Sequence, residues 1–175
     1  MSAAQAAQTR NAGNMIARSL ALRPPGAAAE DVFLRRCVQC GQCAHVCPRQ
    51  AVRMAGGPGA RRNTPEIRPR EAPCMLCMKC PPLCPSGALD NSVTVMERAN
   101  MGRALILKDR CYNFTGGVMC WTCYDRCPLR GSAVVLRDGV LPTITDRCVG
   151  CGVCEYVCPV NAVVTLPKEA LPHAS

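Results

Sequence analysis

Sixteen cysteines provide most of the chemistry available to this 175-residue chain. They fall into four groups of four, and the last cysteine of each group is followed by proline. The first cysteines of successive groups are 37 residues apart each time, so the groups form an internal repeat. The groups are Cys37, Cys40, Cys43, Cys47; Cys74, Cys77, Cys80, Cys84; Cys111, Cys120, Cys123, Cys127; and Cys148, Cys151, Cys154, Cys158.

The spacing within the groups separates the possible uses of so many thiols. Three groups read C-x2-C-x2-C-x3-C-P, whereas the third has eight residues between its first two cysteines. Disulfide frameworks occur in cysteine-rich chains, but thiols three residues apart on one tight loop are poor partners for each other. Zinc needs only four ligands, usually from two separated C-x2-C pairs. The pattern is that of bacterial iron-sulfur proteins, in which three thiolates bind one cubane and the fourth completes a neighbouring one.

We therefore expect all sixteen cysteines to bind four [4Fe-4S] clusters. A loop with a cysteine at every third position directs three thiolates at three irons, while its backbone N–H groups face the sulfides. Glycine allows such a loop to turn closely, and Gly41 and Gly152 occupy the same place in the first and fourth groups. The chain has no catalytic set and no nucleotide-binding motif, so we expect an electron carrier and not an enzyme.

How the groups pair is a separate prediction. Groups one and four share the form Cys-Val-x-Cys-Gly-x-Cys, which favours a nested arrangement with groups two and three inserted between them. The alternative pairs neighbouring groups, one with two and three with four. The nested ligand sets are Cys37, Cys40, Cys43 with Cys158; Cys148, Cys151, Cys154 with Cys47; Cys74, Cys77, Cys80 with Cys127; and Cys111, Cys120, Cys123 with Cys84.

Composition indicates an unusual core. The chain has one Trp, three Tyr and two Phe, so large aromatic side chains cannot fill the interior, and the clusters must do so. We therefore expect the metal-free chain to be largely unfolded. The formal charge of +9 at first suggests nucleic acid, but four clusters with about two negative charges each reduce it to about +1. No nucleic-acid partner is expected.

The elements that position the cysteine loops are expected to be short, because 15 Pro and 14 Gly leave little room for long helices. Residues 134–137 and 140–144 flank Asp138-Gly139, a strong hairpin signal, and a looser hairpin is expected between 93–96 and 104–107. The predicted fold class is α+β, with two interlocked bacterial dicluster ferredoxin-like units made of short helices and β-hairpins around the clusters.

The nested pairing also defines the predicted domains. Residues 1–30 form a flexible or docking tail, 31–65 plus 132–167 an outer unit, 66–131 an inserted inner unit, and 168–175 a second tail. No run approaches 18 apolar residues, so no membrane span is expected. Neither a twin-arginine nor a Sec signal is visible near the start, which indicates the cytoplasm.

Short motifs accompany the cysteine groups, namely Arg23-Pro24-Pro25-Gly26, Phe33-Leu34, Cys77-Met78-Lys79-Cys80, Cys84-Pro85-Ser86-Gly87-Ala88-Leu89, Met101-Gly102, Cys123-Tyr124 and Cys127-Pro128-Leu129. On these motifs, residues 23–167 resemble the ferredoxin-type iron-sulfur proteins of the NapG/MauM group. The resemblance implies four [4Fe-4S] clusters and an electron-relay role without substrate chemistry.

The resemblance also implies partners, namely a membrane quinol-oxidising iron-sulfur protein and a downstream cytochrome or reductase. Members often start with a twin-arginine signal, so the periplasmic face of the inner membrane is the alternative to the cytoplasm. The expected function is relay of single electrons between these partners. The alternative is an iron-sulfur electron-transfer subunit of a larger oxidoreductase such as a molybdoenzyme.

Overall fold

A computed structural model describes residues 21–56 and 62–171 of the chain. All of its elements are short, as the proline and glycine content predicts. The α-helices are α2 (Glu30–Arg36), α3 (Gln42–His45), α4 (Tyr112–Thr115), α5 (Thr122–Asp125) and α6 (Val153–Val157). The strands are β1 (Val52–Met54), β2 (Pro65–Ile67), β3 (Gly102–Ile106), β4 (Val134–Arg137), β5 (Leu141–Ile144) and β6 (Val163–Pro167), and the 3-10 turns are η1 (Pro81–Leu83), η2 (Met96–Arg98) and η3 (Lys168–Ala170).

The strands form three antiparallel pairs, β1–β2, β4–β5 and β3–β6. The β4–β5 pair is the hairpin predicted around Asp138-Gly139, with Val134 opposite Ile144. Asp138 and Gly139 have φ angles of 53° and 73° and are the central residues of a turn in which the Val140 N–H donates to the Arg137 carbonyl oxygen at 3.1 Å; positive φ at both positions matches the twist of the flanking strands. This hairpin prediction is confirmed.

The second predicted hairpin, between 93–96 and 104–107, is wrong. Residues 96–98 form η2, and β3 pairs instead with β6, with Gly102 opposite Pro167. The approach at Gly102 is very close, because a Cβ atom there would lie 2.0 Å from the carbonyl oxygen of Leu166. The local turn signal therefore marks the entry to a strand whose partner is about 60 residues away in the sequence.

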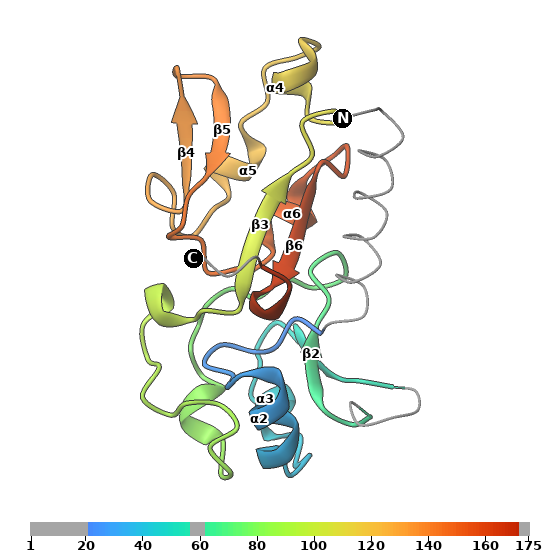
Figure 1. The fold of residues 1–175 in the computed structure, drawn as a ribbon, viewed down its shortest axis with the longest axis vertical. Coiled ribbons are helices and arrows are strands. Elements are labelled where there is room, and N and C mark those ends of the chain that lie inside the picture. The colour runs from blue at the N-terminus through green and yellow to red at the C-terminus, as the bar shows by residue number, and fades with distance from the viewer. Residues whose placement is uncertain (1–20, 57–61, 172–175) are drawn as a thin grey trace.

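The elements sort into two units with the same plan, one at the bottom and one at the top of Figure 1. In the first unit the β1–β2 pair connects cysteine groups one and two, and in the second the β4–β5 hairpin connects groups three and four. In both, the chain before the earlier group pairs with the chain after the later group, through an Ala27–Leu89 bridge in the first unit and through β3–β6 in the second.

The predicted nested domains are therefore wrong. Residues 31–65 pack with the segment that immediately follows them, and 132–167 pack with the segment that immediately precedes them. The physical reason is that antiparallel pairing closes each unit on itself over a short stretch of chain, so no unit needs to be inserted into another. The α+β class, with short helices and strand pairs, is as predicted.

The boundary of the predicted N-terminal tail also needs correction. Residues 1–20 lie outside the described part of the structure, but residues 21–25 and 27 are buried in the folded protein. Leu22 is buried and bridges Ile67, and Ala27 is buried against Leu89. The segment carries no hydrophobic period, which is why the sequence indicated a tail. Of the predicted C-terminal tail, Lys168–Ala170 form η3, and 172–175 lie outside the described residues.

The core is built around cysteines. One apolar cluster contains Phe33, Leu89 and Cys80, and another contains Val163, Cys123 and Cys154. A third joins the two units and holds Leu76 and Met78 from one with Val149, Cys151 and Val153 from the other. Within 21–56 and 62–171 no helix is long and apolar enough to cross a membrane. The compartment stays a prediction.

Candidate iron-sulfur sites

The three regular cysteine loops share one backbone conformation. Two positions in each loop adopt positive φ, namely the second residue after the first cysteine and the residue directly after the second cysteine. Alternating left-handed residues curve a loop so that its N–H groups face a common centre, an arrangement found at many iron-sulfur sites. The predicted role of Gly41 and Gly152 is thus supported. The residues are Gln39 (57°) and Gly41 (72°), Leu76 (54°) and Met78 (53°), and Gly150 (73°) and Gly152 (82°).

Each group forms a short helical turn that includes or directly follows its third cysteine, namely α3, η1, α5 or α6, and then reaches its Cys-Pro. In three groups the chain beyond the proline donates a backbone N–H to the sulfur of the last cysteine. The donor–sulfur distances are 3.3 Å from Ala51 to Cys47, 3.3 Å from Leu89 to Cys84 and 3.2 Å from Ala162 to Cys158. Such hydrogen bonds stabilise a thiolate.

The structure brings the sixteen cysteines together in four sets, each with three cysteines from one group and the fourth from the neighbouring group. We number these sites in spatial order. The first site is Cys37, Cys40, Cys43 and Cys84; the second is Cys47, Cys74, Cys77 and Cys80; the third is Cys127, Cys148, Cys151 and Cys154; and the fourth is Cys111, Cys120, Cys123 and Cys158.

The nested pairing of groups is therefore wrong. Cys84 lines the first site in place of Cys158, and Cys47 lies by Cys74 instead of by Cys148. The cause is the topology of each unit, because strand pairing returns the chain after the later group to the side of the earlier group. The likeness between groups one and four reflects a shared loop conformation and not proximity in space.

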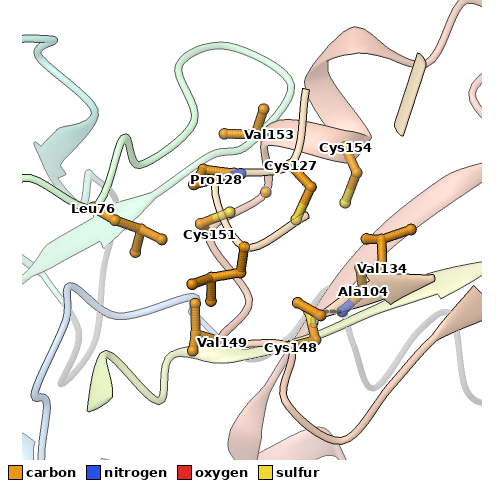
Figure 2. Close-up of a pocket in the computed structure, with 13 residues that line it drawn as sticks. Leu76, Ala104, Cys127, Pro128, Val134, Cys148, Val149, Cys151, Val153 and Cys154 are labelled. Atoms are coloured by element: carbon orange, nitrogen blue, oxygen red, sulfur yellow. Dashed lines mark hydrogen bonds between the residues drawn. The ribbon is translucent and has the colours of Figure 1, made fainter. Parts of the chain in front are cut away.

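Three of the sites line hollows of nearly equal size, about 340, 340 and 350 Å³ of space between atoms, part of it open to solvent. Figure 2 shows the third site, where Cys127 arrives from group three and faces Cys148, Cys151 and Cys154. Its remaining walls are apolar, with Leu76, Val149 and Val153 among them. Such walls exclude water and lower the local dielectric constant.

The thiols in these sites have perturbed pKa values. Burial, with a smaller contribution from neighbouring cysteines, raises the pKa of Cys43, Cys74 and Cys123 to about 11 each and that of Cys151 to about 12. Cys84 differs, because hydrogen bonds from the Leu89 N–H and the Ser86 hydroxyl outweigh its burial and lower its pKa. The deeply buried thiols need a positively charged group beside them to become thiolates.

The donor sets fit [4Fe-4S] clusters. Among the described residues, no three His, Cys, Asp or Glu side chains could hold one metal ion between them. The sulfurs instead surround a hollow, which suits a polynuclear group whose four irons each take one thiolate. All-cysteine ligation, N–H groups directed at sulfur and apolar walls are the environment that such a group requires.

Neighbouring sites adjoin one another. Cys43 of the first site packs against the apolar cluster that contains Cys80 of the second, and Cys123 of the fourth lies in one apolar cluster with Cys154 of the third. Between the second and third sites, the backbone N–H of Cys74 donates to the carbonyl oxygen of Cys151 at 3.0 Å. The four sites thus follow one another in a single series through both units.

Sequence reasoning missed two buried charges near the sites. Glu155 lies between the third and fourth cysteines of group four and is 7% exposed; its carboxylate accepts a hydrogen bond from the Thr165 N–H at 2.6 Å and pairs with Arg70 at 3.2 Å. Arg23 is 2% exposed and pairs with Glu30 at 2.6 Å. A charged residue amid Val153, Tyr156 and Val157 was the one available signal for Glu155.

These sites, set in two small α+β units, define a ferredoxin-type iron-sulfur protein. The family described as a 4Fe-4S dicluster domain matches residues 36–88, which span groups one and two, and a 4Fe-4S binding domain matches residues 141–164 around group four. The first match covers both groups of the first unit, in agreement with pairing between neighbours.

Comparison with known proteins identifies the family. The methylamine utilization ferredoxin-type protein MauM of Methylorubrum extorquens is 40% identical over 167 residues, which cover 87% of this chain and 76% of the relative. The ferredoxin-type protein NapG of Escherichia coli is 39% identical over 168 residues, 86% of this chain and 72% of NapG. MauM of Paracoccus denitrificans is 38% identical over 178 residues, which cover 94% of this chain and 78% of the relative.

The chain belongs to the NapG/MauM family of ferredoxin-type proteins. The resemblance found in the sequence is thereby confirmed. Ferredoxin-type proteins transfer electrons through 4Fe-4S clusters and are not enzymes by themselves, so the predicted cofactor type and the expectation of an electron carrier are also confirmed.

Proposed function

We propose that the chain relays single electrons through four [4Fe-4S] clusters, one in each site, between a membrane quinol-oxidising partner and a downstream redox protein. The observation that carries the proposal is the series of four adjacent cysteine sets. A bound [4Fe-4S] cluster takes up and returns one electron. Membership in the NapG/MauM family supports redox partners of this kind.

In this proposal the chain supplies ligands, shielding and spacing. The three cysteines of each loop and the fourth from the neighbouring group hold one cluster, and backbone N–H groups bond to the ligand sulfurs. Apolar walls keep water away, as at the third site. These are the contributions by which a protein sets the potential of a bound cluster.

The series has two ends, where we propose that the partners exchange electrons. At the first site Cys40 is exposed to solvent. Beside the fourth site the longer loop of group three forms α4 and carries exposed Val118 and Met119. The second and third sites lie between these ends, against the core that joins the units.

Anaerobic purification with iron and sulfide quantitation, followed by redox titration monitored by EPR, tests the four-cluster relay. We expect about 16 irons per chain and reversible one-electron transitions at several potentials. Fewer than about 12 irons per chain would contradict four [4Fe-4S] clusters.

Pairs of alanine substitutions test the ligand sets. With Cys37 and Cys84 at one site, the double variant C37A/C84A loses about four irons, the content of one cluster. C84A combined with C111A removes ligands from two different sites, so about eight irons are lost. A nested arrangement predicts the reverse order of losses, and its observation would refute the proposed sets.

A further inference from the structure

The contact between the two units is made by the ligand loops themselves. Cys74 begins the loop of the second site, and its N–H donates to the carbonyl oxygen of Cys151, a ligand position of the third site, at 3.0 Å. Both cysteines are buried. One hydrogen bond therefore connects the middle two sites of the series directly, through the backbone of a ligand residue on each side.

Leu76 is buried in the same apolar cluster as Cys74 and Cys151. It belongs to the loop of the second site, yet its side chain lines the hollow of the third, as Figure 2 shows. It is 3% exposed and packs in one cluster with Val149, Cys151 and Val153 of the other unit. Its side chain thus extends from the loop of the second site to the wall of the third.

The backbone at Leu76 is unusual for its residue type. Its φ angle of 54° lies in the left-handed region, which is costly for a bulky side chain. The matching loop positions carry Gln39, which is exposed, and Gly150. Of these three equivalent positions, only position 76 lies in the loop of the second site and faces the other unit. Leucine occupies this position in a strained backbone conformation.

Further contacts hold the units together beside Leu76. Gly152 packs so closely on Pro69 that an added Cβ would lie 2.5 Å from the proline Cβ. Arg70 of the first unit pairs with buried Glu155 of the second and donates to the carbonyl oxygen of Val163 at 3.1 Å. The junction is therefore held by the close Gly152–Pro69 packing and the polar contacts of Arg70, together with the buried side chain of Leu76.

We propose that Leu76 is a positioning residue that couples the two units, keeping water out of the Cys74–Cys151 hydrogen bond and fixing the separation of the second and third sites. The inference rests on the proposed function, because it takes both sites as cluster sites. It adds a residue that binds no cluster but sets how the two middle sites face each other.

Hydrogen exchange of the iron-loaded full chain, read by mass spectrometry, tests this role at the Cys74 amide. Pro73 has no amide proton, so the preceding position does not obscure the signal. The test variant is L76N, because asparagine adopts positive φ readily and so retains the loop conformation while bringing a polar group into the gap. The matched control is Q39N, at the equivalent exposed position of the first loop.

We expect L76N to speed exchange of the Cys74 amide at least about tenfold and Q39N to leave it unchanged. L76M, which keeps an apolar side chain of similar volume, should stay within about twofold of wild type. The EPR spectrum of the reduced protein should also lose part of the magnetic interaction between clusters in L76N and retain it in Q39N.

Unchanged exchange in L76N, or an equal increase in Q39N, would overturn the role of Leu76. If L76N does not retain iron, L76A takes its place with the same criterion. Iron is measured in the same samples, so the two proposals fail separately. A full iron content with unaltered exchange in L76N refutes only the proposed role of Leu76 between the units. Low iron in the wild type refutes the four-cluster function.

Discussion

Arg23 shows how a single residue holds the start of the folded chain. Its guanidinium is 2% exposed, pairs with Glu30, donates to the Thr64 hydroxyl at 2.9 Å and to the Pro65 carbonyl oxygen at 2.8 Å, and stacks over Phe33. A buried charge is tolerated only when its hydrogen-bonding groups have partners in this way. Arg23 therefore fastens the entering segment to both α2 and the loop before β2.

Replacing this side chain should be costly. We expect R23A to destabilise the iron-loaded protein by about 3–5 kcal/mol, because it breaks the largely buried ion pair between Arg23 and the Glu30 carboxylate. The thermal midpoint should fall by roughly 10 °C. R35A is the matched control, since Arg35 forms an ion pair with Asp31 in the same helix but both side chains are 67% exposed. An equal fall in both variants would contradict the role of burial.

At the residue scale, the cysteines could be predicted and their neighbours could not. The spacing of the sixteen thiols carries its own chemistry, because three ligands on one tight loop suit a cubane and little else. Leu76 and Glu155 have no such signal. Each of them acts through a contact with the other unit. Leu76 packs against Val149 and Val153, and Glu155 pairs with Arg70. Contacts of that range are absent from any local pattern.

At the scale of elements, strand pairing decides which cysteines meet. The β4–β5 hairpin was predictable because the signal at Asp138-Gly139 is local and its geometry demands positive φ at both residues. The β3–β6 pair joins residues on either side of groups three and four and leaves no local signature. The cysteine groups were paired wrongly because the sequence carries no local signature of this strand pair. Comparison of loop sequences identifies loops of similar conformation but does not show which loops are adjacent.

A substitution at Gly102 tests the closure of the second unit. In G102A the new Cβ would lie 2.0 Å from the Leu166 oxygen and 2.9 Å from its carbonyl carbon, both backbone atoms of the paired strand. We expect β3–β6 to separate, the third and fourth sites to lose their clusters, and the iron content to fall by about half. The first and second sites should remain, because their unit closes through Ala27 and Leu89.

The matched control for this substitution is G117A in the same unit. A Cβ at Gly117 would meet only Tyr112, at 3.9 Å, which is ordinary contact, so its iron content should equal that of the wild type. Iron and sulfide quantitation after anaerobic purification measures both variants. A full complement of iron in G102A would show that strand pairing does not close the second unit.

At the scale of the whole molecule, two units of like plan are joined so that four sites form a series. The joining core contains Cys74 and Cys151, so the contact between units is also the contact between ligand loops. In this small protein with six aromatic residues, each apolar cluster includes cysteines of the sites. The composition predicts a core filled by metal clusters. It does not predict where the two units meet, because that depends on the order in which the strands pair.

From this arrangement we predict that folding depends on iron. Each site ties together cysteines from two groups, so bound clusters cross-link the chain, and three of the sites are hollows of about 340 to 350 Å³ within or beside apolar clusters. At neutral pH the buried thiols of the metal-free chain are protonated, because burial raises the pKa of Cys43, Cys74 and Cys123 to about 11. Loss of iron therefore does not leave buried negative charges behind. It destabilises the fold because the hollows in the core are no longer filled and the cross-links between cysteine groups are lost.

We expect the metal-free chain to be largely unfolded as a result. Chelation of iron under strictly anaerobic, reducing conditions, which keep the thiols from forming disulfides, should abolish the cooperative thermal transition in circular dichroism and bring most amides to rapid hydrogen exchange. A sample taken through the same steps without chelator is the control, and it should keep both its transition and its iron. A cooperative transition in iron-free protein would mean that the apolar side-chain clusters suffice for folding. The iron-sulfur clusters would then serve electron transfer alone.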